Sequence, residues 1–460
     1  MTTVRSTPRT GSGAAGALLL DPALAGRAFE AARPVSYGRL TELRGLHLQV
    51  RGVDVAVGDL LEVHGQDGPV PVEAVAALPS GIVCLPLGST HGLRVGARVS
   101  ETGGPLRVPV GDALTGRVLD GLGRPIDGGP SLAHLPMVSV ENATPNPLER
   151  GRVDLQVGLG VRALDSLVPA GRGQRVGIFA GSGVGKSTLL SMIARGTEAQ
   201  VSVIALVGER GREVREFLEN DLGPEGLARS VVVVATSDAP PVERLRAAFV
   251  ATRIAEWFRD CGRDVVLMMD SLTRVAMAQR EIGLSAGEPP ATRGYPPSVF
   301  GVLPKLLERA GPGRVGSITG LYTVLVEGDD MQDPIGDTAR SILDGHIVLS
   351  RRLATSGHYP SIDVLESLSR VVGAITTAEQ RGDATTLRRL LAAHRDVREL
   401  VEIGAYAPGS SPDADRALAL LPHVNAFLQQ SVDEPTPAAE TWRRLHDLMT
   451  GPVGGAGVAS

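Results

Sequence analysis

Residues 180–188 constrain the fold of this chain more than any other stretch, because they combine three glycines with Lys186 and Ser187. An apolar run over 176–179 precedes them, and a segment with helical character follows over 189–195. A strand, a glycine-rich loop and a helix in this order predict a phosphate-binding loop, since the backbone N–H groups of the loop and the helix N-terminus converge on one anion.

The predicted loop assigns a role to several of its residues. Glycine lets the backbone turn where a Cβ would obstruct it, Lys186 would contact the β- and γ-phosphates of a nucleoside triphosphate, and the Ser187 hydroxyl would bind Mg²⁺. The motif begins with Ala180 instead of glycine, so it matches the relaxed form of the pattern. The predicted nucleotide-binding residues are Gly181, Ser182, Gly183, Val184, Gly185, Lys186, Ser187 and Thr188.

The composition limits the class of protein. A chain of 460 residues is long enough for two or three domains, and 43% hydrophobic with 21% charged residues is the profile of a globular protein. The net charge of -5 gives no overall basic field that would favour nucleic acid. Cys84 and Cys261 lie far apart without a His or Cys cluster near them, which argues against a metal site or a disulfide framework.

The apolar runs are too short for a membrane protein. None approaches the roughly 18 residues that a membrane span needs, and the run over 17–20 is too short for the core of a signal peptide. We therefore expect a cytoplasmic protein, which partners would have to hold if it works at a membrane.

The pattern of residue types changes several times along the chain. Short β-branched runs separated by Gly, Asp and Pro between 38 and 99 predict a small barrel or sandwich, while 104–173 is rich in Gly and Pro and is predicted to form turns and linkers. From Gly173 onward, apolar runs alternate with helical segments, which predicts a parallel α/β sheet covered on both faces. Beyond Arg370, apolar residues recur at three- and four-residue steps, so this part is predicted to be helical.

Two carboxylates stand at the ends of predicted strands. Asp270 closes the apolar run 265–269, a position from which a carboxylate reaches Mg²⁺ held by a phosphate loop. Glu209 follows the apolar run 201–207, and a carboxylate beside the γ-phosphate can polarise a water molecule for in-line attack. Spacing alone leaves other readings open, because Asp270 can be a turn residue and Glu209 can belong to the acidic start of a helix.

Six segments, in order, resemble the ATPase of the bacterial flagellar export apparatus and the related type III secretion ATPases, which are in turn similar to the catalytic subunit of rotary ATP synthases. The resemblance covers roughly residues 20–435 and implies an α/β fold, with a RecA-like P-loop ATPase core between a small N-terminal β-barrel domain and a C-terminal helical domain. It also implies a homohexamer with ATP at the subunit interfaces. The six segments are 179–188, 207–221, 270–281, 287–311, 327–352 and 357–370.

The resemblance and the changes in residue pattern together predict where the domains begin and end. The expected divisions are a disordered tail (1–16), an N-terminal helix that binds a partner or serves only in packing (17–34), the β-barrel domain (35–103), the RecA-like ATPase domain (104–372), the helical domain (373–450) and a tail (451–460).

The resemblance implies roles at the phosphate loop. Lys186 would act on the phosphates, Glu209 would be the catalytic glutamate, and Ser187 and Asp270 would bind Mg²⁺. Glu209 argues against a non-hydrolysing regulatory subunit, which lacks this residue.

Three further features take a role from the resemblance. Arg370 would reach into the site of a neighbouring subunit as a third catalytic residue, and Tyr359 would stack on adenine. The proline-rich run 287–298 would face the central pore and meet a stalk protein. From the residues alone, Arg370 is one surface charge among 46 basic residues, Tyr359 before a proline is ordinary packing, and 287–298 is a structural connection.

The implied function is hydrolysis of ATP that energises protein export through the flagellar type III apparatus, at its cytoplasmic face. The implied partners are stalk-like and regulatory export proteins and chaperone–substrate complexes, with peripheral membrane association through partners and no nucleic acid. A virulence-type secretion ATPase is the alternative within the class. An RNA translocase fits less well, because residues 38–99 are poor in aromatic side chains. Ala180 and the Lys186–Ser187 pair argue against an ATP synthase catalytic subunit.

Overall fold

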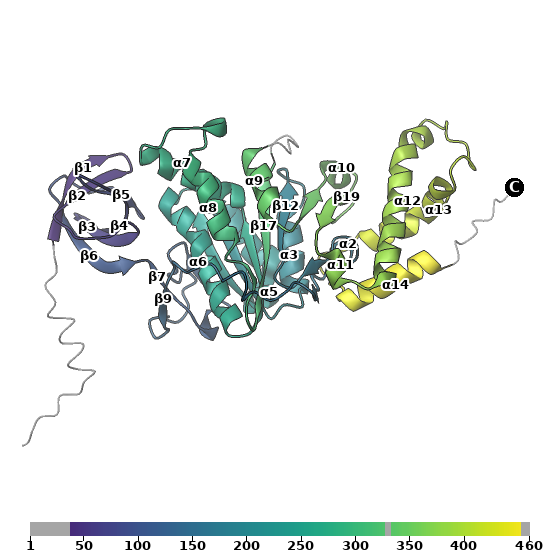
Figure 1. Ribbon diagram of the computed structural model, residues 1–460, viewed down its shortest axis with the longest axis horizontal. Coiled ribbons are helices and arrows are strands. Elements are labelled where there is room, and N and C mark those ends of the chain that lie inside the picture. The colour runs from purple at the N-terminus through teal and green to yellow at the C-terminus, as the bar shows by residue number, and fades with distance from the viewer. Residues whose placement is uncertain (1–36, 327–332, 452–460) are drawn as a thin grey trace, which may run out of the picture.

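The computed structural model of the protein describes residues 37–326 and 333–451. Three bodies follow one another along the long axis of the molecule: a β-barrel, a central sheet covered by helices, and a group of C-terminal helices (Figure 1). This arrangement confirms the predicted fold class. The predicted helix over 17–34, the tail 1–16 and all but the first residue of the tail 451–460 lie outside the described residues.

The N-terminal body is a closed barrel in the strand order β1-β2-β5-β4-β3-β6, and closure leaves no free strand edge. Its interior is filled by aliphatic side chains without exposed surface, among them Leu40, Val50 and Leu61. The short apolar runs 46–50, 60–63 and 82–85, on which the prediction of a barrel or sandwich rests, coincide with β2, β3 and β5. The bounds are Tyr37–Arg44 (β1), His47–Arg51 (β2), Asp59–Gly65 (β3), Gly68–Leu78 (β4), Gly81–Pro86 (β5) and Arg98–Pro105 (β6).

The central body is built on a nine-stranded sheet in the order β19-β18-β12-β17-β15-β13-β14-β8, with β16 paired to β17. Neighbours along this path are parallel except β18 and β19, which pair antiparallel at one edge. The bounds are Val118–Asp120 (β8), Arg175–Ala180 (β12), Val201–Glu209 (β13), Ser230–Thr236 (β14), Asp264–Asp270 (β15), Gly311–Pro312 (β16), Ser317–Leu325 (β17), Gly345–Leu349 (β18) and Ile362–Ser369 (β19).

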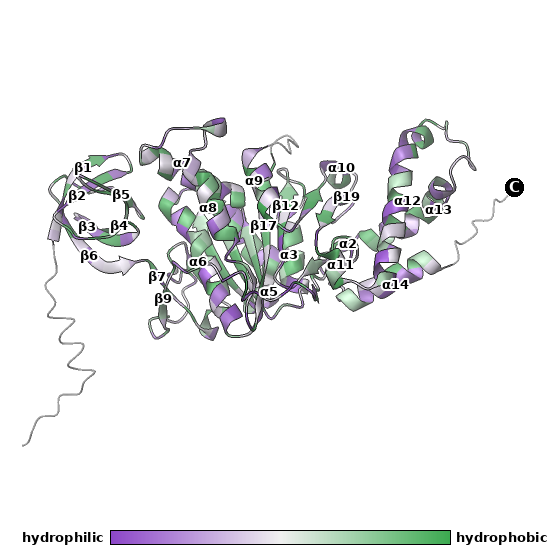
Figure 2. Ribbon diagram, in the orientation of Figure 1, coloured by the Kyte–Doolittle hydropathy of each residue, from purple (hydrophilic) through white to green (hydrophobic). Residues whose placement is uncertain are grey.

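Apolar side chains cover both faces of this sheet, which is why its strands read as continuous apolar runs. Successive residues of β13 belong to two different cores: Val203 shares one with α6 (Pro241–Asp260) and α7 (Leu272–Ser285), and Ile204 shares the other with α3 (Lys186–Gly196). Figure 2 shows the hydrophobic colour concentrated on the strands, while the helices carry both colours. The sheet is therefore the buried layer of the molecule.

The segment 104–173 is more structured than predicted. It supplies β8, which pairs with β14 at the edge of the sheet, and a small ribbon of β7 (Arg107–Pro109) with β9 (Met137–Ser139). It also supplies the helix α2 (Arg162–Leu167). The prediction of turns and linkers was wrong for these stretches, because elements this short give no periodic pattern that could be recognised in the sequence.

The C-terminal body consists of α12 (Ala378–Glu402), α13 (Pro412–Leu428) and α14 (Ala438–Thr450), which pack on one another and on α2. Thr377 and Gln380 form a capping box at the start of α12. Ser411 caps α13 and Pro412 is its first residue.

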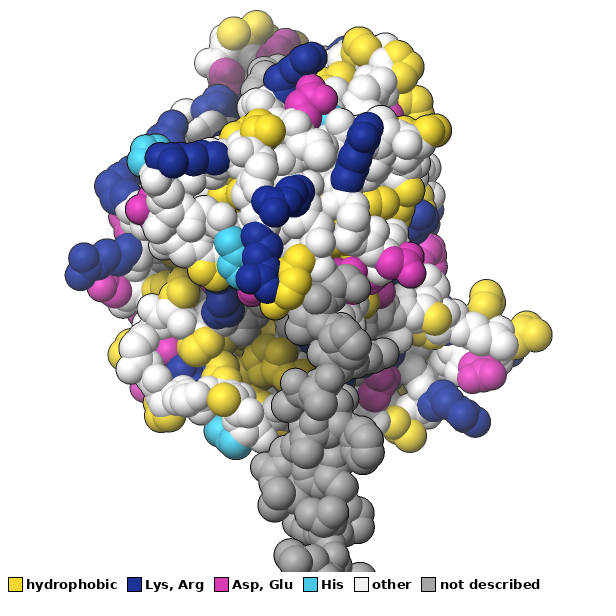
Figure 3. Space-filling model, turned by 90° about the vertical axis from the view of Figure 1, so that its left-hand side faces the viewer, with side chains coloured by type: hydrophobic (Ala, Val, Ile, Leu, Met, Phe, Trp, Pro, Cys, Tyr) yellow, Lys and Arg dark blue, Asp and Glu magenta, His cyan; other side chains and the backbone are white. Residues whose placement is uncertain are grey.

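Among the residues that the structure describes, no helix is both long and apolar enough to cross a bilayer. The end of the molecule that carries the barrel presents basic side chains with acidic and hydrophobic ones between them (Figure 3).

A buried ion pair joins the barrel to the central body. Arg246 on α6 donates from Nε to Glu73 Oε2 on β4 at 2.7 Å, and from Nη1 to Glu141 Oε1 at 2.7 Å. The Arg246 and Glu73 side chains are 10% and 9% exposed. The barrel therefore meets the central body through a charge pair that is largely shielded from water.

We expect Arg246→Met to lower the free energy of unfolding by about 3–5 kcal/mol, because it leaves the Glu73 carboxylate buried and unpaired. Chemical denaturation would measure the loss. Arg215→Met is the matched control, since it removes an exposed pair with Glu219 and should cost about 0–1 kcal/mol. Equal losses in the two variants would contradict the prediction.

Candidate active site

Several sequence-predicted site residues come together at the carboxyl edge of the parallel strands. β12 leads into the glycine-rich loop and then into α3, while Glu209 and Asp270 are the last residues of β13 and β15. In the pairing of these two strands Leu206 stands opposite Asp270, so both carboxylates leave the sheet at the same edge. β17 lies between β12 and β15. Stretches far apart in sequence thus contribute to one site.

Lys186 is at the centre of this group. Its Nζ is 2.6 Å from Asp270 Oδ1 and 3.3 Å from Glu209 Oε1, and the three side chains are only 14%, 5% and 15% exposed. Burial lowers the pKa of Lys186, but the two carboxylates outweigh that effect and the pKa is raised. Burial also raises the pKa of Asp270, against the opposing charge of Lys186. The lysine therefore carries its charge at neutral pH.

Thr323 is a site residue that sequence reasoning missed. It lies in β17 and donates from Oγ1 to Asp270 Oδ1 at 2.7 Å, so the same carboxylate oxygen accepts from Thr323 and Lys186. Thr323 has no exposed surface. Buried hydroxyls are usually hydrogen-bonded, but β17 also contains Ser317 and Thr319, so nothing in the sequence singles out Thr323.

The phosphate loop has the backbone that its glycines predict, with one difference. Gly183 and Gly185 have φ angles of 74° and 96°, a region that favours glycine. Gly181 has no positive φ, so its conformation does not require glycine. Gly185 immediately precedes α3, whose first residue is Lys186. The positive end of this helix and its free N–H groups are therefore available to an anion.

A cavity beside the start of α3 could hold a magnesium nucleotide. Ser187 and Asp270 both line it, and so does Glu209. Mg²⁺ prefers hard oxygen ligands, and this cavity offers a hydroxyl and carboxylates within reach of a charged lysine. The residues present therefore fit Mg²⁺ together with the phosphates of a nucleotide. The remaining polar residues of the lining are Thr188, Glu213, Glu216 and Asp221.

Tyr359 lies against the phosphate loop. A Cβ placed on Gly185 would stand 3.6 Å from Tyr359 Cε1, so the ring borders this glycine directly. Two residues further on, Ser361 Oγ donates to Val184 O at 2.5 Å. The tyrosine is 46% exposed, which leaves part of its side chain open to a ligand.

Arg370 is not brought to the phosphate loop of its own chain. It follows β19, and its N–H donates to Asp344 O, while the N–H of Asp344 donates to Arg175 O. Arg370 therefore lies beside the N-terminal end of β12, whereas the phosphate loop follows the C-terminal end of the same strand. The six residues of β12 correspond to roughly 20 Å. Its exposed guanidinium donates to Arg340 O, at 3.3 Å.

The proline-rich run 287–298 is mostly irregular, as its composition predicts. It contains one 3₁₀ turn at Thr292–Gly294, and α8 (Pro297–Leu307) begins in its last two residues. Proline is favoured at the first position of a helix, which explains why α8 starts there.

Two family descriptions match this chain. The nucleotide-binding domain of the ATP synthase alpha/beta family matches residues 160–369, and the C-terminal domain of the T3SS EscN ATPase matches 376–447. The first range contains the phosphate loop, Glu209, Asp270 and Tyr359, and ends one residue before Arg370.

Individual proteins match over nearly the whole chain. The flagellum-specific ATP synthase of Bacillus subtilis is 52% identical over 90% of this chain and 95% of its own length. The type 3 secretion system ATPase of Xanthomonas euvesicatoria is also 52% identical, over 90% of this chain and 93% of its own. Among solved structures, the assembled ATPase EscN of enteropathogenic E. coli, in complex with its central stalk EscO, superposes with a TM-score of 0.84. It is 44% identical and covers 90% of this chain and 100% of its own.

Proposed function

The chain belongs to the family of flagellum-specific and type III secretion ATPases, which makes it an ATP hydrolase of protein export, and we propose that the residues gathered at the phosphate loop carry out the hydrolysis. One observation carries this proposal: the Lys186 ammonium lies within 3.3 Å of both Glu209 and Asp270, directly behind the loop. Opposite charges held around one lysine at a helix start form a site for a phosphate chain with its metal ion.

Each residue has a distinct task in this proposal. The N–H groups of 181–188 and the Lys186 ammonium bind the β- and γ-phosphates, and Ser187 and Asp270 hold Mg²⁺ by oxygen ligands. When bound, the ion neutralises charge on the phosphates. Glu209 orients a water molecule and accepts its proton as the water attacks the γ-phosphorus in line. Tyr359 stacks on the adenine.

Arg370 is proposed to act on a neighbouring subunit. It lies at the opposite end of the strands from its own loop, so Arg370 would reach a transferred phosphoryl group only in the site of another chain, where it would stabilise the developing charge. A ring provides such contacts at every interface. The related EscN was solved as an assembled ATPase with a central stalk, which supports a homohexamer with a stalk partner here.

The same relationship supports the remaining partners. The run 287–298 is proposed to meet the stalk, and regulatory proteins and chaperone–substrate complexes of the export apparatus are proposed as further partners. They would hold the ATPase peripherally at the cytoplasmic face of the apparatus. We propose no nucleic-acid partner.

We assign the chain to flagellar export. Relatives named flagellum-specific ATP synthase are 50–52% identical to it. A virulence-type secretion ATPase remains the alternative, because one such relative is equally similar. Expression in a strain that lacks its flagellar ATPase should restore motility. Restoration of secretion alone, in a strain lacking the virulence-type ATPase, would favour the alternative.

The proposed shared site predicts that ATPase activity depends on assembly. Specific activity should rise with protein concentration in step with the appearance of an oligomer, because a single subunit lacks the arginine at its loop. Phosphate release and mass determination over the same dilution series would measure both. A constant specific activity from a monomer would contradict the proposal, and stimulation by RNA would favour an RNA translocase.

A further inference from the structure

We propose that Arg162 and Gln430 are positioning residues for Tyr359, and that they set how strongly the base contributes to nucleotide binding. They act through residues 429–436, which join α13 to α14 and which we call the connector. The inference deepens the proposed function and rests on the role of Tyr359 in it.

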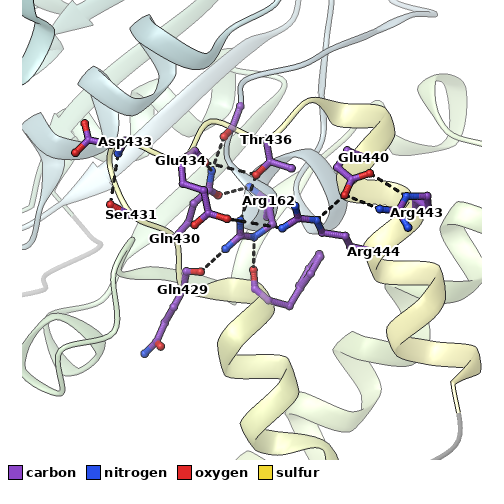
Figure 4. Close-up of polar contacts among 12 residues, drawn as sticks. Arg162, Gln429, Gln430, Ser431, Asp433, Glu434, Thr436, Glu440, Arg443 and Arg444 are labelled. Atoms are coloured by element: carbon purple, nitrogen blue, oxygen red, sulfur yellow. Dashed lines mark hydrogen bonds and ion pairs between the residues drawn. The ribbon is translucent and has the colours of Figure 1, made fainter.

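Arg162 fixes the course of the connector. It is the first residue of α2 in the central body, yet its guanidinium lies among connector residues (Figure 4). Its Nε donates to Phe427 O at 2.8 Å and its Nη2 to Gln429 O at 2.5 Å. Its Nη1 donates to Glu434 Oε1 at 2.7 Å and Thr436 Oγ1 at 3.2 Å. The side chain is 4% exposed. A guanidinium is planar and its N–H donors point in fixed directions, so one that bonds several backbone and side-chain oxygens fixes the conformation of the connector as well as pairing with its charge.

Gln430 anchors the connector at the centre of this network. Its Oε1 accepts from the Arg162 N–H at 2.8 Å, and its Nε2 donates to Gly160 O at 2.7 Å and Glu434 O at 2.5 Å. Gln430 is 6% exposed. Because both ends of the amide have partners in a buried place, the residue has one favourable position.

The backbone of Gln430 in turn holds the tyrosine. Its N–H donates to Tyr359 O at 3.0 Å, and on the other side Tyr359 borders Gly185 of the phosphate loop. Tyr359 is 46% exposed, so a backbone hydrogen bond has to supply order that packing does not. The contacts therefore run from Arg162 through Gln430 to Tyr359 and the nucleotide loop.

This chain of contacts predicts an effect on the base and not on the phosphates. A tyrosine that is already in place loses less freedom when a base stacks on it. If the connector shifts, Tyr359 becomes mobile and the stacking contribution falls. Lys186 contacts Asp270 and Glu209, whereas the connector meets α3 near the other end of that helix, through Asp433 and Arg195, a pair that Gln430→Met leaves in place.

The test is Gln430→Met, which keeps the length of the side chain and removes its amide. We expect the Kd for ATP to rise by roughly fivefold or more, the lower end of what stacking on an aromatic ring contributes. The Kd for inorganic tripolyphosphate, which has no base, should stay unchanged, and kcat should change by less than about twofold. Arg162→Lys keeps the charge and loses the planar set of N–H donors. It should likewise raise the Kd for ATP and not that for tripolyphosphate, and it replaces Gln430→Met as the test if that variant does not fold.

Trp442→Phe is the matched control. Trp442 on α14 is buried and donates from Nε1 to Gln156 Oε1 at 2.9 Å, so it also fastens the helical domain to the core, but through Gln156 and not through the connector. This variant should lower the melting temperature without changing the Kd for ATP. A weaker affinity in Trp442→Phe, or a loss of tripolyphosphate binding in Gln430→Met, would overturn the inference in favour of general damage.

A double-mutant cycle separates this inference from the proposed function. In a Tyr359→Ala background, Gln430→Met should have no further effect on the Kd for ATP, because both changes remove the same contribution. Effects that multiply, or no effect of Gln430→Met in the parent protein, would refute the positioning role. If Tyr359→Ala itself leaves the Kd for ATP unchanged, the proposed stacking role is the part that fails.

Discussion

Glu209→Gln should abolish ATP turnover and preserve ATP binding. The amide keeps the size of the side chain but cannot accept a proton from the attacking water, and loss of such a group typically lowers kcat by about 10²–10⁴-fold. The Kd for ATP should change only a few-fold, because Lys186 keeps its 2.6 Å contact with Asp270. Phosphate release under saturating ATP, together with equilibrium binding of ATP, would measure both quantities.

Glu219→Gln is the control for this variant. Glu219 follows on the same stretch of chain, but it is exposed and pairs with Arg215, so its loss should leave both kcat and Kd unchanged. Normal hydrolysis by Glu209→Gln would refute the assignment of Glu209 as the catalytic base. A large loss of ATP binding would instead mean that Glu209 serves to hold Lys186 in place.

Arg370→Ala should lower kcat by about 10³–10⁵-fold, the usual contribution of an arginine supplied by a neighbour. The fold should tolerate the change, because the guanidinium is exposed and makes one 3.3 Å hydrogen bond to Arg340 O. ATP binding to a single subunit should persist, since Arg370 lies at the opposite end of the strands from the loop. Arg389→Ala, which removes an exposed pair with Asp413 on another helix, should leave kcat unchanged.

A mixing experiment decides whether Arg370 acts between subunits. Arg370→Ala subunits retain an intact loop with Glu209, and Glu209→Gln subunits retain an intact arginine. At an equal ratio, about one quarter of the interfaces of a randomly mixed ring should pair the two intact halves, so activity should reappear from two inactive proteins. If the mixture stays inactive while rings of mixed composition form, the arginine does not act in trans.

Much of the candidate site could be read from local sequence. The phosphate loop, Glu209 and Asp270 each follow an apolar run, and the structure indeed ends β12, β13 and β15 at these points. Strand ends are readable because the change from apolar to polar residues coincides with the edge of a buried sheet.

Other parts of the site had no local signal. Thr323 is one of several hydroxyl residues in β17, and only the insertion of β17 between β12 and β15 puts it beside Asp270. Arg162 and Gln430 are 268 residues apart, and nothing in either neighbourhood points to the other. β8 was missed because three residues cannot display a period.

The sequence by itself determined that a phosphate loop follows a buried strand, that two carboxylates close other strands, and that a helical part ends the chain. These properties depend on residue type and spacing along one element, where hydrophobic periodicity and glycine content act directly. Tertiary structure alone decided the order of the strands. That order, with the parallel direction of β12, β13 and β15, brings Lys186, Glu209 and Asp270 together at one end of the strands. The antiparallel β19 leaves Arg370 at the other end. The physical reason is that strand order results from packing of whole elements against one another, so a site shared between distant segments is a property of the assembled core.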